Sequence, residues 1–116
     1  AQTTGNLVCI TDRDHVVAVA GNGKKEFDGK PLSKQMEDII ESREDFVANK
    51  EDSSFVKITL DDTGELSSQA VATIICQGDA IGAVVISNKK EDYQMGDTEH
   101  QLAVTAAGFL GRQMEQ

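Results

Sequence analysis

Most of the chain consists of short apolar runs separated by polar turns, a pattern typical of β-hairpins. Residues 6–21 (NLVCITDRDHVVAVAG) contain two such runs on either side of residues 12–14, whose two aspartates favour a tight turn. Residues 69–76 (QAVATIIC) and 80–87 (AIGAVVIS) form a second pair around a short turn that contains glycine. This second pair is apolar at successive positions, so both faces of its strands should be covered, as in the centre of a sheet.

The region between the two predicted hairpins is more polar, and its pattern predicts one helix and one strand. In residues 32–43 apolar side chains recur at helical spacing, and Pro31 is well placed near the first helical turn. In residues 55–60 (FVKITL) the side chains alternate with period two, which favours a half-buried or edge strand. We predict loops for residues 21–31, from their Gly, Asn and Pro, and for residues 43–54, which are irregular and polar.

The chain ends on a predicted helix for which Asp97 is a favourable N-cap. The order of elements is therefore two strands, a helix, three strands and a helix. This order predicts the α+β class, with an antiparallel sheet of about five strands and helices on both faces. With 116 residues the chain is long enough for one domain with one hydrophobic core and too short for two.

The closing helix is apolar over a wider arc than packing on a single sheet requires. A helix that lies on one core needs an apolar stripe of about 100°, whereas this arc covers roughly 160°. It consists of Leu102, Ala103, Ala106, Ala107, Phe109, Leu110 and Met114. Gly108 and Gly111 lie beside the arc, and each glycine inside a helix costs about 1 kcal/mol relative to alanine. Either a neighbouring group comes close to them, as in a helical bundle between protomers, or both are neutral surface residues.

The charge of the chain argues against direct binding of nucleic acid. Twenty acidic residues outnumber eleven basic ones, for a net charge of −9, and the doublets at residues 24–25 and 89–90 are each followed at once by an acid. Binding to phosphates through counterion release needs clustered Lys and Arg. The chain has no apolar run of membrane-spanning length and no leader, and its start at Ala1 indicates trimming or processing. We expect a cytoplasmic protein that makes no membrane contact.

No group of residues has the spacing that a catalytic or metal site needs. Cys9 and Cys76 lie in apolar runs, which indicates reduced, packed thiols rather than a disulfide or a nucleophile. His15 and His100 are far apart and have no further ligand at metal-binding spacing. Residues 21–25 (GNGKK) are similar to an anion-binding loop but lack the spacing of a P-loop, and a plain turn explains them better. The sequence therefore predicts no enzyme, no metal site and no cofactor.

Several stretches of the chain resemble a known family. Residues 6–33 (NLVCITDRDHVVAVAGNGKKEFDGKPLS), 78–87 (GDAIGAVVIS) and 95–116 (MGDTEHQLAVTAAGFLGRQMEQ) are similar to the C-terminal domain of the stage V sporulation protein T family of endospore-forming bacteria. The resemblance covers essentially the whole chain and is weakest at residues 46–68. It implies a single GAF-type sensor domain over residues 1–116, without the N-terminal DNA-binding domain and the leading helix of the parent protein.

The resemblance also implies a function. The parent protein is a regulator of forespore genes, binds DNA only through its N-terminal domain and forms a tetramer in which GAF domains pair through their terminal helices. This chain would then act in signal sensing and oligomerisation, and we expect at least a dimer. The expected interface is Leu102, Ala106, Phe109, Leu110, Gln113 and Met114. Gly111 departs from the family pattern, in which we expect alanine.

A GAF-type domain implies a pocket for a small molecule, of unknown identity, between the sheet and residues 21–68. Its candidate lining residues are Phe27, Phe55, Thr73 and Ile75, and plain core packing is the alternative for all four. Two other functions stay open at this point. One is a structural interaction module of the related roadblock type, which binds no ligand. The other is a GAF-like thiol enzyme, which would need cooperating thiols in loops.

Overall fold

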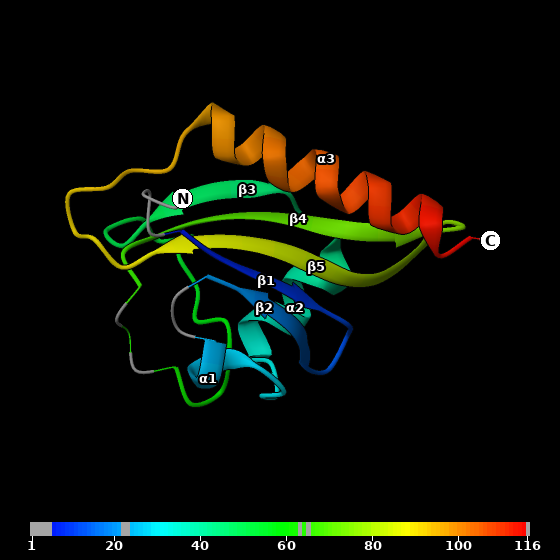
Figure 1. The fold of residues 1–116 in the computed structure, drawn as a ribbon, viewed down its shortest axis with the longest axis horizontal. Helices are drawn as coiled ribbons and strands as arrows, with labels where there is room; N and C mark the ends of the chain where they lie inside the picture. The colour runs from blue at the N-terminus through cyan, green and yellow to red at the C-terminus, as the bar shows by residue number, and fades with distance from the viewer. Residues whose placement is uncertain (1–5, 22–23, 63, 65, 116) are drawn as a thin grey trace.

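The computed structural model describes residues 6–21, 24–62, 64 and 66–115. In chain order its elements are β1 (Leu7–Thr11), β2 (Val16–Ala20), α1 (Lys24–Phe27), α2 (Lys34–Ser42), β3 (Phe46–Asn49), β4 (Ser68–Cys76), β5 (Asp79–Asn88) and α3 (Asp97–Gln113). The five strands form one antiparallel sheet with the order β2-β1-β5-β4-β3. As Figure 1 shows, α3 covers one face of this sheet, and α1 and α2 lie on the other. The predicted α+β class and the five antiparallel strands are confirmed.

Both predicted hairpins are present, and local chemistry explains their turns. Between β1 and β2 the Asp12 carboxylate accepts hydrogen bonds from the N–H groups of Asp14 and His15, both at 2.7 Å. Between β4 and β5 the chain turns at Gln77 and Gly78, whose φ angles are 52° and 85°. Two consecutive positive φ angles are the requirement of the tight turns whose twist matches that of the strands. The two strands of this hairpin lie inside the sheet and are buried along most of their length, as their apolar runs predict.

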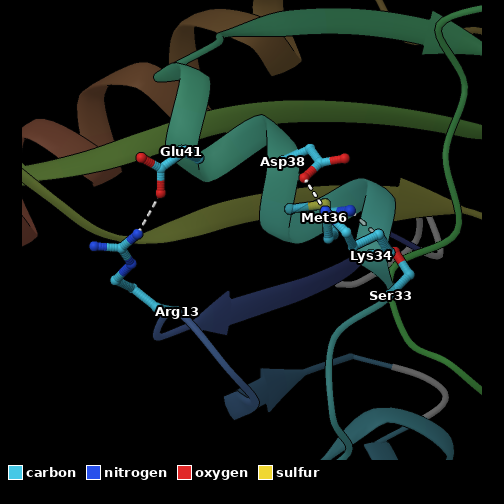
Figure 2. A network of polar contacts seen from close by, with 6 residues as sticks. All are labelled: Arg13, Ser33, Lys34, Met36, Asp38 and Glu41. Atoms are coloured by element: carbon cyan, nitrogen blue, oxygen red, sulfur yellow. Dashed lines mark hydrogen bonds and ion pairs between the residues drawn. The ribbon is translucent and has the colours of Figure 1, made fainter.

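Helix α2 lies within the predicted residues 32–43, and hydrogen bonds at both ends limit it. The Ser33 hydroxyl accepts a hydrogen bond from the Met36 N–H at 3.0 Å, which satisfies a donor of the first turn (Figure 2). Arg43 ends the helix in the left-handed conformation, with φ 59°. Its N–H bonds carbonyl groups of the last turn.

Two ion pairs lie on the exposed side of α2 (Figure 2). Lys34 and Asp38 pair along the helix at 2.7 Å, and Arg13 from the β1–β2 turn pairs with Glu41. All four side chains are more than half exposed, so each pair contributes only about 0.2–1 kcal/mol. Only the Arg13–Glu41 pair links the first hairpin to α2, and neither pair contributes much to stability.

Two predictions for the middle of the chain are wrong. Residues 55–60 form no strand, and β3 lies instead at Phe46–Asn49, in a stretch predicted as a loop. β3 is an edge strand of four residues that pairs with β4, with Phe46 opposite Val71. Its short length and polar surroundings leave almost no periodic signal, so its pairing with β4 decides its conformation.

A buried side chain, rather than a neighbouring strand, holds the segment that was predicted as a strand. Gln69 of β4 is fully buried, and its amide donates to the Val56 carbonyl and accepts from the Val56 N–H, both at 3.0 Å. A primary amide offers the same donor and acceptor as a peptide group, so Gln69 takes the place of a paired strand. Ile58 is fully buried and Leu60 is 66% exposed, although strict alternation would place both on one face.

The structure differs from the sequence prediction in two smaller details of the helices. Residues 21–31 contain the short helix α1 in addition to the predicted loop. The N-cap of α3 is Gly96, and Asp97 is its first helical residue. The Gly96 N–H donates to Glu99 Oε1 at 2.9 Å, which is the reverse bond of a capping box. An acid at Asp97 remains favourable because the first turn carries the positive end of the helix dipole.

The sheet separates two hydrophobic clusters of different character. The cluster on the side of α2, the α2-side core, consists mainly of large side chains: Leu7, Cys9, Val16, Phe27, Leu32, Met36, Ile39, Ile40, Ile58, Leu66, Val71, Ala80, Ala83 and Val85. The cluster on the side of α3, the α3-side core, contains four alanines among its eight buried members: Ala70, Ala72, Ile74, Val84, Ile86, Met95, Ala103 and Ala107. The sequence pattern predicts that both faces are covered, but not this difference.

Candidate functional site

Helix α3 packs on the sheet through its smallest side chains. Its buried residues are Ala103, Ala107 and Gly111, which are spaced by four positions and so lie on one side of the helix. A Cβ atom on Gly111 would lie 2.1 Å from the Ile75 carbonyl oxygen, so only glycine permits this approach to β4. The close approach predicted as one alternative for the glycines is therefore confirmed at Gly111, and the neighbour is the chain's own sheet. At Gly108 a Cβ would meet only the end of an arginine side chain, at 3.5 Å.

Two large apolar residues of α3 and the methionine at its C-cap are exposed. Leu102, Phe109 and Met114 are 56%, 55% and 61% exposed. Leu102, Ala106, Phe109 and Gln113 follow the spacing i, i+4, i+7, i+11, which is the spacing by which one helix contacts another. We call these four residues the outer stripe. Two of its members, Leu102 and Phe109, are exposed large apolar residues on the same side of the helix.

The six predicted interface residues divide between two environments. Ala106 and Leu110 are partly buried and pack against the α3-side core. The other four are exposed: Leu102, Phe109, Gln113 and Met114. Their role in an interface stays a prediction, and the exposed four are the residues that a partner could reach.

An apolar hollow extends this exposed surface onto the first hairpin. It has a volume of about 230 Å³, and Leu110 and Met114 form its helix side. Val17 and Ile81 border it from the sheet, and Val17 is 53% exposed. The outer side of α3 therefore continues into a second apolar surface at the C-terminal end of the helix.

The four predicted ligand-lining residues lie in different surroundings. Phe27 is 5% exposed in the α2-side core, and Phe55 packs against the same core. Thr73 donates from its hydroxyl to the Glu44 carbonyl at 2.9 Å, and Ile75 is 36% exposed near the end of β4. Phe27 also borders a surface hollow of about 190 Å³. The structure brings Phe27 and Phe55 into one cluster, and ligand binding by the four residues stays a prediction.

A polar hollow of about 290 Å³ lies where β3 ends and where the chain leads into α3. Its lining comes from three separate segments: residues 49–51, Ser67, and a third segment that supplies Glu91, Tyr93 and Gln94. Within the last segment, Tyr93 donates a hydrogen bond from its hydroxyl to Glu99 in the first turn of α3. Sequence reasoning missed this site because no segment carries a motif by itself, and β3, which supplies Asn49, was not predicted.

The two cysteines differ in accessibility. Cys9 is fully buried in β1, and this burial, together with the Asp62 carboxylate, raises the pKa of its thiol to about 12. A thiol with such a pKa stays protonated at neutral pH and is a poor nucleophile. Cys76 is only half-buried at the end of β4, and both cysteines are free. The predicted packing of both thiols in the core therefore holds for Cys9 and only partly for Cys76.

The turn of the first hairpin groups three potential metal ligands that the sequence analysis did not combine. Side-chain atoms of Asp12, Asp14 and His15 lie within 4.8 Å of one another, and all three residues are exposed. The Asp12 carboxylate already accepts two backbone hydrogen bonds, so the turn itself explains the grouping.

The alternative of an anion-binding loop at residues 21–25 depends on Asn22 and Gly23, which lie outside the described residues. Over the described part of the chain, no helix has the length and apolar character that crossing a bilayer requires.

The fold is that of GAF domains. The A. aeolicus nlh2 GAF domain in an inactive state aligns with a TM-score of 0.65 and 15% identity, covering 94% of this chain and 73% of that chain. The GAF domain/HD domain protein from Geobacter sulfurreducens aligns with a TM-score of 0.64 and 14% identity, covering 98% and 84%. A type II free methionine-R-sulfoxide reductase from Thermoplasma acidophilum aligns with a TM-score of 0.65 and 14% identity, covering 94% of this chain and 78% of that chain. At such identities the similarity shows the fold alone, so the class of the protein is a GAF-like domain.

The sequence narrows this class to one family. Residues 1–115 match the family described as "Stage V sporulation protein T C-terminal, transcription factor". Stage V sporulation protein T of Bacillus subtilis (strain 168) is 40% identical over 112 residues, which are 97% of this chain. The chain therefore belongs to the stage V sporulation protein T C-terminal family, as the resemblance implied. It spans 61% of the length of that relative.

Proposed function

We propose that the chain is the regulatory domain of a longer sporulation transcription regulator, in which it pairs copies of the protein through α3 and responds to a small molecule. The family's description as a transcription factor supports the regulatory role. DNA would be bound by a different domain, since this one carries a net charge of −9 and phosphates would repel it. A transcription regulator would act in the cytoplasm, and the family resemblance supports the forespore as the compartment in this proposal.

The exposure of Leu102 and Phe109 in the outer stripe of α3 is the observation that supports pairing. Leu102 and Phe109 lie one heptad apart, and each leaves more than half of its side chain in water. Full burial of such a side chain contributes about 1.5–3 kcal/mol, so covering the exposed part adds about 1 kcal/mol per residue. In a symmetric dimer every contact occurs twice, which doubles this contribution. Ala106 between them is small enough for two helices to approach closely.

Sedimentation velocity on the double variant Leu102→Asp, Phe109→Asp tests the pairing. We expect the wild-type chain to sediment as a dimer or larger assembly and the double variant as a monomer, because carboxylates cannot be buried against each other. Leu60→Asp is the matched control, since Leu60 is 66% exposed but lies in the segment before β4, away from α3. A double variant that keeps the wild-type assembly, or a monomeric wild-type chain, would refute pairing through α3.

A catalytic role has less support than a regulatory one. The likeness to a sulfoxide reductase rests on 14% identity and shows the fold alone. The raised pKa of Cys9 makes that thiol unreactive at neutral pH. In the proposed function the domain is therefore not an enzyme.

A further inference from the structure

We propose that the polar hollow between the end of β3 and the start of α3 binds a small molecule through a primary ammonium group. Four residues carry the argument: Asn49 and Glu51 from one wall, and Glu91 and Tyr93 from the other. This inference deepens the proposed sensing role and rests on it for its biological meaning. Binding itself is measurable without reference to pairing.

A residue that lines the hollow carries an unused hydrogen-bond acceptor. Asn49 Oδ1 is buried and, among the described residues, has no hydrogen-bond partner. The backbone of Asn49 is held in place, because its N–H donates to Asp52 Oδ2 and its carbonyl accepts from the Asp52 N–H, both at 2.8 Å. A buried acceptor without a donor costs about 1–3 kcal/mol. A ligand N–H group that reached Asn49 would recover this free energy.

Two further unpaired polar atoms lie on the α3 side of the sheet, although neither residue lines the hollow. Ser68 is directly opposite Asn49 in the β3–β4 ladder, so their side chains share a face, and its fully buried hydroxyl has no partner within the described chain. His100 Nε2 on α3 is also buried and unpaired there. Gly111 of α3 contacts Ile75, and α3 and β4 run in the same direction (Figure 1). Eleven helical residues span about 16 Å, or about five strand residues, which places His100 near the start of β4.

This concentration of unpaired atoms is unusual, because more than about 90% of buried polar groups in proteins have a partner. Hydrophobic packing does not explain it, since the hollow is lined mainly by polar residues. A polar ligand that enters the hollow would meet the residue that carries one of these atoms, Asn49.

The charges around the hollow select the ligand class. Glu51 and Glu91 line it together with one cation, Lys50, so carboxylates outnumber ammonium groups. Such a lining attracts a cation and repels phosphates and simple carboxylates. The volume of about 290 Å³ lies at the lower limit of small-molecule sites, so the ligand has few heavy atoms. A small primary ammonium compound satisfies the acceptor, the charge and the size.

The site has a short connection to α3. Tyr93 lines the hollow, and its hydroxyl donates to Glu99, which also accepts the Gly96 N–H at 2.9 Å at the start of the helix. A ligand that contacts Tyr93 therefore acts on the residues that begin the proposed pairing helix.

Titration of the ¹⁵N-labelled chain with ethanolamine tests the site, with ethylene glycol as the neutral analogue and acetate as the anionic one. We expect saturable shifts at residues 49–51, Ser67 and residues 91–94 for ethanolamine only, with a Kd on the order of millimolar for so small a probe. Shifts that do not saturate, or equal shifts with ethylene glycol, would overturn the ammonium assignment.

Two substitutions at Asn49 should change the affinity for ethanolamine in opposite directions. Asn49→Leu removes the acceptor and should weaken ethanolamine binding about tenfold or more, whereas Asn49→Asp adds a charge and should tighten it several-fold. Gln35→Leu, an amide replaced on the exposed side of α2, is the control and should leave binding unchanged. Unchanged binding in both Asn49 variants would refute the site.

Sedimentation of the same samples separates the two proposals. If the wild-type chain pairs but does not bind ethanolamine, the ligand inference fails while pairing stands. If ethanolamine binds a chain that sediments as a monomer, the pairing proposal fails and the ligand site stands.

Discussion

The two faces of the sheet are covered in different ways. On one face, large side chains such as Met36, Ile40 and Ile58 fill the space between the sheet and α2, and each is at most 1% exposed. On the other face, α3 lies close to β4 because Ala107 and Gly111 keep its contact side small. The first face is stabilised by the burial of large side chains. The second is stabilised by the close packing of the α3 backbone on the β4 backbone.

This difference decides which face is available to partners. In the α2-side core the large apolar side chains are used inside the domain. In α3 the small side chains take the inner positions, so Leu102 and Phe109 remain outside and half exposed. A helix that packs through Ala and Gly therefore leaves Leu102 and Phe109 exposed, and these two residues form the surface of the proposed pairing. The effects of substitutions on the free energy of unfolding should then differ between the two faces, in size and in sign.

The largest effect is expected for Met36→Ala in the α2-side core. Met36 is 0% exposed, and replacing a buried Met by Ala costs about 2–5 kcal/mol of the free energy of unfolding, through lost transfer energy and a cavity. Met114→Ala is the matched control, because Met114 is 61% exposed and should change stability by less than about 0.5 kcal/mol. Urea denaturation measures both, and equal losses would contradict the distinction between the inner and outer positions.

The next effect concerns the close contact of α3. Gly111→Ala would place a methyl group 2.1 Å from the Ile75 carbonyl oxygen, so the helix must shift, at a cost of about 1–3 kcal/mol. Gly108→Ala in the same helix meets no such obstacle and should stabilise the domain by up to about 1 kcal/mol, through helix propensity. If urea denaturation shows a lower free energy of unfolding for Gly111→Ala and a higher one for Gly108→Ala, the close packing of α3 is supported. A stabilising Gly111→Ala would refute it.

A smaller, pH-dependent effect is expected where α3 begins. The hydrogen bond from the Tyr93 hydroxyl, and after it that from the Gly96 N–H, lower the pKa of Glu99 below its ordinary value of 4.5, against the opposing effect of burial. A carboxyl group whose pKa is lower in the folded state stabilises the fold above the unfolded-state pKa, and this contribution disappears as pH falls through the folded-state pKa.

Glu99→Gln should therefore cost about 1 kcal/mol at neutral pH and should reduce the loss of stability below about pH 4.5. Tyr93→Phe removes the same hydrogen bond and should reduce that acid-dependent loss in the same direction. Thermal unfolding of the wild type and the two variants between about pH 7 and pH 3 measures this acid-dependent loss of stability. Parallel curves for wild type and both variants would show that this contact does not contribute.

The smallest effect on folding is expected on the outer stripe. Phe109→Ser should change the free energy of unfolding of the monomer by less than about 0.5 kcal/mol, measured at a concentration too low for association. At high concentration the wild type should gain stability relative to this variant, because association stabilises the folded state by mass action. A large loss in the dilute sample would mean that Phe109 supports the domain's own core.

Much of the fold could be predicted because its determinants are local. The hairpins follow from short apolar runs and from turn residues such as Asp12 and Gly78, whose roles depend on a few neighbouring residues. The central position of β4 and β5 follows from their two apolar faces. Membership of the family also follows from sequence, since residues 1–115 carry its pattern.

The segments that could not be predicted depend on distant partners. β3 is a strand because β4 lies beside it, and residues 55–60 are not one because the amide of Gln69 takes up the hydrogen bonds of Val56. The polar hollow joins residues 49–51 with residues 91–94, which are about forty positions apart in the sequence. Nothing in either segment alone marks a site.

For α3, the sequence by itself determined that the helix is apolar over a wide arc and that its two glycines require an explanation. Only the tertiary structure decided that the small side of this arc faces the sheet and that Gly111, not Gly108, is required there. The physical reason is that helix propensity and amphipathicity are properties of one helix. The clearance between Gly111 and the Ile75 carbonyl is a distance between two backbones, and it exists only once the sheet is assembled.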